Sequence, residues 1–226
     1  MVLAAGSGSR YGPQPKQYEV LGDERVIDRS LATARAAADH VVVVLAPADQ
    51  AEGEALVESG AADVAVEGGA ERADSVRAAL AVIDADAAVI VVHDAARPLA
   101  SAELHQAVVA AVHAGADAVI PAVPVIDTVK RVRHDEHGDA VVVETLDRTH
   151  LVAVQTPQAF RADLLRAAHA DGADATDDAA LVEAAGGKVV VVPGEVDNRK
   201  ITVARDLDDL LAQRAAADAE PAIPPE

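Results

Sequence analysis

A glycine-rich stretch near the start of the chain has the residue types of a phosphate-binding loop. The sequence LAAGSGSRYG (residues 3–12) interleaves glycines with Arg10, and Lys16 follows shortly after it. Small residues let backbone N–H groups approach an anion closely, and the two cations would hold its charge. The stretch is not a P-loop, since no Gly-Lys-Ser/Thr follows, and not a dinucleotide fingerprint, since Tyr11 replaces the third glycine. An ordinary turn with solvated cations is the alternative, which the combination of glycines with Arg10 and Lys16 disfavours.

A second polar stretch, GGAERADSV (68–76), follows an extended segment and opens a helical pattern. Gly69 and Ser75 are its best candidates for a binding role. Glu71, Arg72 and Asp74 could equally form a charged helix start, since acidic residues are favourable near a helix N-terminus.

A third stretch, VHDAARP (92–98), follows the most apolar run in the chain. Ligands of doubly wound sheets bind at the carboxyl ends of the strands, which makes Asp94 and Arg97 candidate site residues. The alternative is an ion-paired loop anchor. His93 has no second candidate ligand or catalytic residue beside it, and we interpret it as a packing residue.

The composition excludes several classes of function. The absence of cysteine excludes disulfides, thiolate catalysis and cysteine-ligated zinc, and the eight histidines form no H-E-x-x-H pair. A net charge of −19 disfavours a nucleic-acid partner, and 1% aromatic residues leave no stacking platform for single strands. No apolar run is long enough to cross a bilayer, and no signal-peptide pattern is visible. We therefore expect a cytoplasmic protein with a small-molecule partner.

Alternating strand and helix patterns predict the scaffold of these residues. Four β-branched runs, at 40–46, 87–94, 117–125 and 188–192, are typical of parallel strands buried on both faces. Helical spacing of apolar residues lies between them, with Ser101 as a predicted N-cap of one helix. We predict one domain over 1–226 with an α/β, doubly wound, mostly parallel (Rossmann-like) sheet, and a disordered proline-rich tail at 219–226.

One segment, 127–150, interrupts the alternation. It contains two short extended patterns around the polar turn HDEHGD and no helical spacing, which predicts a projecting β-hairpin arm. A two-stranded hairpin is marginally stable alone in water, so the arm is expected to pack on a second copy of the chain in a homodimer.

Eight stretches together resemble, in order and spacing, the 2-C-methyl-D-erythritol 4-phosphate cytidylyltransferase family. They are LAAGSGSRYGPQPKQY, GGAERADSV, VHDAARP, DTVK (127–130), DR (147–148), QTPQAF (155–160), TDDA (176–179) and DNRKIT (197–202). The resemblance implies transfer of CMP from CTP to 2-C-methyl-D-erythritol 4-phosphate, giving 4-diphosphocytidyl-2-C-methyl-D-erythritol and pyrophosphate, in non-mevalonate isoprenoid biosynthesis. A substrate phosphate is already an anionic nucleophile, so this reaction needs alignment and charge neutralisation rather than a general base.

The resemblance also implies residue roles. Arg10 and Lys16 would contact the triphosphate, Asp94 would face substrate hydroxyls or the metal, and Arg97 would face the acceptor phosphate. Mg²⁺ would be bound mainly through the CTP phosphates, with no histidine ligand. Thr128 and Arg148 on the arm would reach the partner subunit's pocket. The implied catalytic residues are Arg10, Lys16, Arg148 and Lys200, and the implied substrate-binding residues are Ala4, Ala5, Gly6, Ser7, Gly8, Gly69, Ser75, Asp94, Arg97, Thr128, Thr156 and Thr176.

Some features depart from the family pattern or leave alternatives open. The first strand is expected to be short, and Leu3 and Arg199 occupy positions where the family commonly has a proline and an apolar residue. Thr176 also has the pattern of a helix N-cap, so its role could be structural. A ribitol-5-phosphate cytidylyltransferase and a non-catalytic CTP-binding module are the alternatives, although HDAARP and Arg148 favour methylerythritol phosphate as the acceptor.

Overall fold

The computed structural model describes residues 1–6, 11–12, 15–172, 175 and 177–219. Its main sheet has eight strands. Seven follow the order β10-β7-β11-β6-β1-β4-β5, and the eighth, β12, also pairs with β7. The strands are β1 (Val2–Leu3), β4 (Val42–Leu45), β5 (Val64–Glu67), β6 (Val89–Asp94), β7 (Ala118–Pro124), β10 (Val152–Val154), β11 (Gln158–Arg161) and β12 (Val189–Pro193).

The sheet is mostly parallel, as predicted. Strands β6, β1, β4 and β5 are parallel to one another, and β12 is parallel to β7. The strict alternation of strand and helix was wrong between residues 152 and 161, where two strands follow one another. Strand β11 lies antiparallel between β6 and β7, and β10 lies antiparallel to β7. The four β-branched runs nevertheless all point the same way, because β11 is antiparallel to both of its neighbours.

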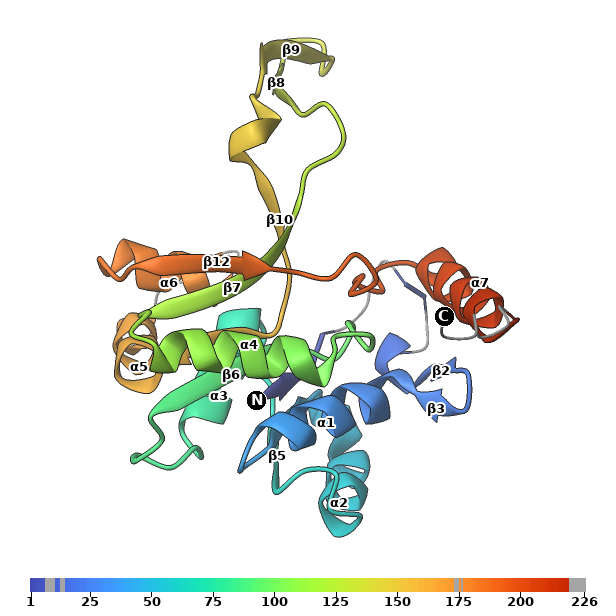
Figure 1. Ribbon diagram of the computed structural model, residues 1–226, viewed down its shortest axis with the longest axis vertical. Coiled ribbons are helices and arrows are strands. Elements are labelled where there is room, and N and C mark those ends of the chain that lie inside the picture. The colour runs from blue at the N-terminus through green and yellow to red at the C-terminus, as the bar shows by residue number, and fades with distance from the viewer. Residues whose placement is uncertain (7–10, 13–14, 173–174, 176, 220–226) are drawn as a thin grey trace, which may run out of the picture.

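Helices cover both faces of the sheet (Figure 1). They are α1 (Val26–Ala37), α2 (Gln50–Glu58), α3 (Arg72–Leu80), α4 (Ala102–His113), α5 (Ala162–Ala170), α6 (Asp178–Ala184) and α7 (Ala204–Ala219), and short 3-10 turns lie at η1 (Lys16–Tyr18), η2 (Pro47–Asp49) and η3 (Arg148–His150). Along β4, Val43 packs with Ile27 and Leu31 of α1, whereas Val44 packs on the opposite face with Val76 of α3. This two-sided burial explains the continuous valine run.

The predicted helix start at Ser101 is confirmed. The Ser101 hydroxyl accepts a hydrogen bond from the Leu104 N–H at 2.9 Å, which satisfies one of the free amides at the start of α4. The N-cap predicted at Thr176 was wrong. Asp177 caps α6 instead, since its carboxylate accepts from the Ala180 N–H at 3.0 Å, and Thr176 lies outside the described residues.

The segment 127–150 forms the predicted hairpin arm. Strands β8 (Lys130–His134) and β9 (Ala140–Thr145) pair antiparallel, with a bulge between Arg131 and Val132. Figure 1 shows the arm standing away from the sheet, beyond the ends of β7 and β10. Every residue of its two strands is exposed in the single chain. A second small antiparallel ribbon pairs β2 (Val20–Leu21) with β3 (Glu24–Arg25).

The described helices include none with both the length and the apolar character needed to cross a membrane. Ala219 ends α7, and the remainder of the predicted tail, residues 220–226, lies outside the described residues.

Candidate functional site

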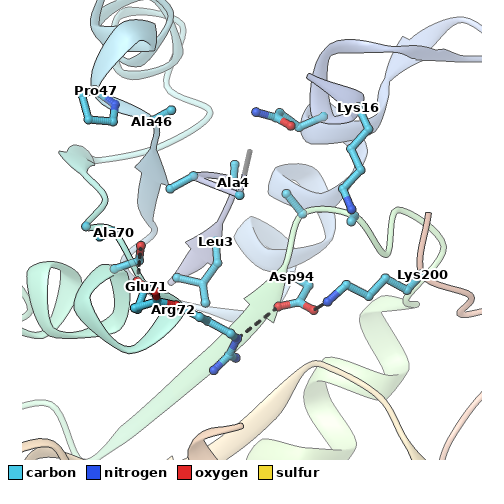
Figure 2. A pocket seen from close by; sticks show the side chains of 17 residues that line it. Leu3, Ala4, Lys16, Ala46, Pro47, Ala70, Glu71, Arg72, Asp94 and Lys200 are labelled. Carbon is cyan, nitrogen blue, oxygen red and sulfur yellow. Dashed lines mark hydrogen bonds and ion pairs between the residues drawn. The ribbon is translucent and has the colours of Figure 1, made fainter. Parts of the chain in front are cut away.

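A cavity of about 500 Å³ opens at the carboxyl ends of β1, β4 and β6. These strands are parallel neighbours, so their ends meet at one edge of the sheet, where doubly wound folds bind ligands. Figure 2 shows side chains entering this space from several loops. The lining residues are Leu3, Ala4, Ala5, Gly6, Lys16, Gln17, Ala46, Pro47, Gly69, Ala70, Glu71, Arg72, Ser75, Asp94, Ala95, Ala96 and Lys200.

The structure therefore brings together eight of the catalytic and substrate-binding residues implied by the resemblance: Ala4, Ala5, Gly6, Lys16, Gly69, Ser75, Asp94 and Lys200. Four others, Ser7, Gly8, Arg10 and Thr176, lie outside the described residues. The remaining four, Arg97, Thr128, Arg148 and Thr156, are described and do not line this cavity.

A tight turn joins β5 to α3 along one wall of the cavity. A Cβ atom at Gly69 would lie 2.2 Å from the Cβ of Asp74, and one at Gly68 would lie 2.4 Å from the Cβ of Ala5. Only glycine fits at either position without displacing its neighbours. Glu71 and Asp74 form a reciprocal capping box at the start of α3, which gives these acids the structural role that the sequence left open. Ser75 is buried, and its hydroxyl donates to the Glu71 carbonyl at 3.3 Å.

Asp94 lies at the centre of a charged cluster in the cavity. Its Oδ2 is 2.6 Å from Lys200 Nζ, and its Oδ1 is 3.8 Å from Arg72 Nε (Figure 2). Burial alone would raise the pKa of Asp94, but the positive charges of Lys200 and Arg72 outweigh burial and lower the pKa to about 2. Asp94 is therefore a carboxylate at neutral pH, available to a metal ion or to substrate hydroxyls.

The charged cluster extends behind the cavity wall to Asp178 and His169, to which the sequence analysis gave no role. Arg72 Nη1 lies 2.7 Å from Asp178 Oδ2, and Asp178 Oδ1 lies 3.0 Å from His169 Nε2. Asp178 and His169 have side chains only 1% exposed, so this pair is fully inside the protein. Asp178 belongs to the TDDA stretch, but only the folded chain shows that it holds Arg72.

Lys16 enters the cavity from the side opposite Arg72. It begins η1, and its Nζ donates to the Ile201 carbonyl at 2.7 Å. A backbone carbonyl is a neutral acceptor, whereas a hydrogen bond from an ammonium to a phosphate oxygen is charge-assisted on both sides. An incoming phosphate is thus a stronger partner for Lys16 than this carbonyl.

Thr156 supports the site from behind. Its Oγ1 accepts from the Asp94 N–H at 3.0 Å and lies 3.2 Å from His93 Nδ1. His93 is buried edge-on against His105, with 4.9 Å between ring centroids. Burial, and then the neighbouring His105, lowers the pKa of His93 to about 3. This arrangement supports the interpretation of His93 as a packing residue. The hydrogen bond from the Asp94 N–H to Thr156 helps to fix the backbone of Asp94.

Arg97 points to backbone rather than into the cavity. Its Nη1 donates to the Asn198 carbonyl at 2.7 Å, and its Nη2 donates to the Val154 carbonyl at 3.3 Å. The structure thus matches the alternative of a loop anchor, formed here with carbonyl groups rather than with an acidic side chain. A direct contact with the acceptor phosphate stays a prediction.

Thr128 and Arg148 lie on the arm segment, are exposed and do not line the cavity of their own chain. Arg148 donates from Nη1 to the Ile126 carbonyl. A single chain therefore does not bring the arm residues to the charged cluster.

Among the described residues, no group of three or more His, Asp or Glu side chains could hold a metal ion by itself. Asp94 and Glu71 are the carboxylates that line the cavity. Mg²⁺ is commonly held by one or two carboxylates together with substrate phosphates, and the ionised Asp94 fits that pattern.

Comparisons with known proteins identify relatives of the whole chain. Residues 1–215 match the family described as IspD: 2-C-methyl-D-erythritol 4-phosphate cytidylyltransferase. A protein of that name from Frankia casuarinae is 45% identical over 225 residues, covering 98% of this chain and 82% of the relative. One from Saccharopolyspora erythraea is 47% identical over 218 residues, covering 92% of this chain and 94% of the relative.

A solved structure has the same architecture. The crystal structure of 4-diphosphocytidyl-2C-methyl-D-erythritol synthase from Anaerococcus prevotii superposes with a TM-score of 0.82 at 30% sequence identity. The match covers 95% of this chain and 94% of that one.

Proposed function

The chain belongs to the 2-C-methyl-D-erythritol 4-phosphate cytidylyltransferase family, and from this premise we propose how its own residues carry out the reaction. The protein is a nucleotidyltransferase that transfers CMP from CTP to 2-C-methyl-D-erythritol 4-phosphate and releases pyrophosphate in isoprenoid biosynthesis. The observation that supports the assignment of residues is the cluster of Lys16, Asp94 and Lys200 in one cavity at the carboxyl edge of the sheet.

The chemistry requires alignment of two phosphates and neutralisation of their charge. The acceptor phosphate attacks the α-phosphorus of CTP, and negative charge develops on the departing pyrophosphate. Lys16 and Lys200 present ammonium groups to the cavity, and Arg72 presents a guanidinium beside Asp94. Preorganised cations of this kind stabilise the transition state without a proton transfer, so the lack of a histidine or cysteine base in the cavity lining is consistent with the reaction.

We assign the nucleotide to the wall formed by residues 4–6 and the turn at Gly69. Backbone N–H groups beside small residues can approach phosphate and ribose oxygens closely. The crowded turn at position 69 has room only for glycine, so this wall of the cavity keeps a small residue there. Ser75 would help to hold this wall. Arg10, Ser7 and Gly8 keep the triphosphate-binding roles implied by the family pattern.

We propose that the reaction uses Mg²⁺, held by the CTP phosphates and by Asp94. The ion supplies neutralisation of the triphosphate charge when it is bound. Asp94 supplies a hard oxygen donor that is ionised at neutral pH, because Lys200 and Arg72 offset the effect of burial and lower its pKa. Activity should be lost in excess EDTA and should return on addition of Mg²⁺. Full activity in EDTA would contradict this proposal.

We propose that the protein works as a homodimer whose arms complete each other's sites. The arm exposes Val132, Val142 and Val143 in the single chain, which gives it apolar surface to bury against a partner. Arg148 and Thr128 would then enter the partner subunit's cavity, supplying the groups that their own cavity does not receive.

Mixing two inactive variants tests the shared site. Arg148→Ala and Lys16→Ala should each be nearly inactive alone. After random subunit exchange at equal amounts, half of the dimers are mixed and each has one intact site, so activity should reach at most about a quarter of the wild-type value. No recovery despite demonstrated exchange would place Arg148 in its own subunit's site or outside the site.

Pyrophosphate release from CTP measures the acceptor preference. With 2-C-methyl-D-erythritol 4-phosphate as acceptor, release should be fast, and with ribitol 5-phosphate it should be far slower. Thermal stabilisation by CTP without pyrophosphate release from either acceptor would instead indicate a binding module. We further propose a cytoplasmic location, because CTP is a cytoplasmic nucleotide, and we expect no nucleic-acid partner, because the chain carries a net charge of −19.

A further inference from the structure

The two lysines of the cavity depend on one short segment, residues 198–201. Lys200 belongs to it and binds Asp94 at 2.6 Å, and the carbonyl of Ile201 receives Lys16 Nζ at 2.7 Å. The segment lies between β12 and α7 and belongs to neither a helix nor a strand. One long-range backbone hydrogen bond, from the Ile201 N–H to the Ala96 carbonyl at 2.8 Å, holds its end, and side chains contribute the other contacts that fix its position.

Among the polar residues of the segment, Asn198 is the most deeply buried, with 0% of its surface exposed. Its Nδ2 donates to the Thr156 carbonyl at 2.9 Å and to Gln155 Oε1 at 3.3 Å. Both amide hydrogens are thereby used. An aspartate at this position has the same shape but would place an acceptor against two acceptors.

The backbone around Asn198 is held in the same way. Its carbonyl accepts from Arg97 at 2.7 Å, and Gln155 exchanges two hydrogen bonds with the backbone of Glu195, at 2.7 Å and 3.1 Å. A Cβ at Gly194 would lie 2.6 Å from Gln155 Oε1, so the chain passes very close to this amide.

Thr156, which binds Asn198, also binds Asp94, the ion-pair partner of Lys200. Thr156 gives its carbonyl to Asn198 and its hydroxyl oxygen to the Asp94 N–H. Asn198 and Thr156 thus connect the loop that carries Lys200 to the strand end that carries Asp94. This buried connection fixes the backbone that carries Lys200 relative to the strand end that carries Asp94, next to the backbone hydrogen bond from the Ile201 N–H to the Ala96 carbonyl.

We propose that Asn198 is a positioning residue for the transfer reaction, which fixes Lys200 relative to Asp94 and places the carbonyl that holds Lys16. This inference rests on the proposed function, in which Lys200 contacts substrate phosphate. Asn198 acts through Lys200 and does not line the cavity itself.

A double-mutant cycle on activity tests the role. Asn198→Asp and Asn198→Ser are each made in the wild-type chain and in Lys200→Ala, and kcat and KM are measured by pyrophosphate release alongside thermal melting. In the wild-type background each variant should lower kcat by about tenfold or more, and in Lys200→Ala by less than about threefold, because interacting residues give non-additive effects. The serine variant should retain more activity than the aspartate variant, since a hydroxyl can still donate one of the two hydrogen bonds.

Gln213→Ala is the matched control. Gln213 donates to the Asp197 carboxylate from an exposed position on α7, so its loss touches the same loop without touching the buried connection. Its kcat should stay within about twofold of wild type, in line with the small effects of surface substitutions.

Each other outcome is decisive. Equal losses of kcat in the two backgrounds, or no loss in the wild-type background, would overturn the positioning role. Unfolding of both Asn198 variants would overturn it too, because the residue would then hold the fold rather than the site. Lys200→Ala with wild-type activity would show that the proposed role of Lys200 is wrong, and the single variant reveals this independently of the cycle.

Discussion

Buried His93 makes the stability of the protein depend on pH in a direction that the structure specifies. Burial, and secondarily His105, lowers the pKa of His93 to about 3, whereas an unfolded chain protonates histidine near pH 6.5. Between these values the unfolded state binds more protons than the folded state. The contribution of buried, neutral His93 to the free energy of unfolding is therefore fully present above about pH 6.5 and is lost as the pH falls towards 3.

The size of the effect follows from the two pKa values. Integrating proton uptake for a single group with these pKa values gives a loss of about 2 kcal/mol in the free energy of unfolding between pH 7 and pH 5. His93→Asn removes the titrating ring while leaving a polar atom near Thr156. The variant should lose about 2 kcal/mol less than the wild type over the same pH interval, whatever its stability at pH 7.

Urea unfolding at pH 7 and pH 5, at one protein concentration, measures this difference. His113→Asn serves as the control, because it removes an exposed histidine at the end of α4 and leaves buried His93 and His105 in place. If the wild type and His93→Asn lose the same stability between pH 7 and pH 5, His93 is not held neutral by burial and the reasoning is refuted.

Two further predictions concern charged side chains in the cavity and behind its wall. Lys16→Ala should keep the wild-type melting temperature and lower kcat by about 10²-fold or more, because one preorganised donor contributes about 3 kcal/mol to a transition state; unchanged pyrophosphate release would contradict its role. Asp178→Ala should lower the free energy of unfolding by about 3–5 kcal/mol, because it leaves Arg72 and His169 without their buried partner, and calorimetry should show a melting temperature lower by roughly 6–20 °C. Asp163→Ala, which breaks an exposed ion pair, should cause a much smaller shift, and equal shifts would show that the buried pair has no special weight.

Four strands of the main sheet, β4, β6, β7 and β12, could be predicted because their signals are local. A run such as HVVVVLA at 40–46 is typical of a central strand that is buried on two faces. Ser101 predicts a helix start because it directly precedes residues with helical apolar spacing. Strand β11 could not be predicted in this way. Its four residues, QAFR, carry no clear period, and their strand conformation depends on pairing with β6 and β7 on either side.

The site was predictable where a motif coincides with a strand end. Lys16, Asp94 and Lys200 come together because the carboxyl ends of parallel strands and their loops share one edge. The pairing of Arg72 with Asp178 and the hydrogen bonds of Asn198 were not predictable, because contacts between residues far apart in sequence leave no periodic pattern. The cap at Asp177 rather than Thr176 shows the usual uncertainty of one residue at a helix start.

The antiparallel insertion of β11 has a consequence for synthesis of the chain. Strands β6 and β7 are complete once residue 124 has left the ribosome, but they share no hydrogen bonds, because β11 lies between them and ends only at residue 161. During the interval the arm segment is made, and β6 and β7 each present an unpaired edge. Joining Val92 to Gln158 closes a long loop, which slows folding, and open strand edges favour aggregation. A nascent chain that stops before residue 158 should therefore need a chaperone, whereas one that reaches residue 161 can join the two parts of its sheet.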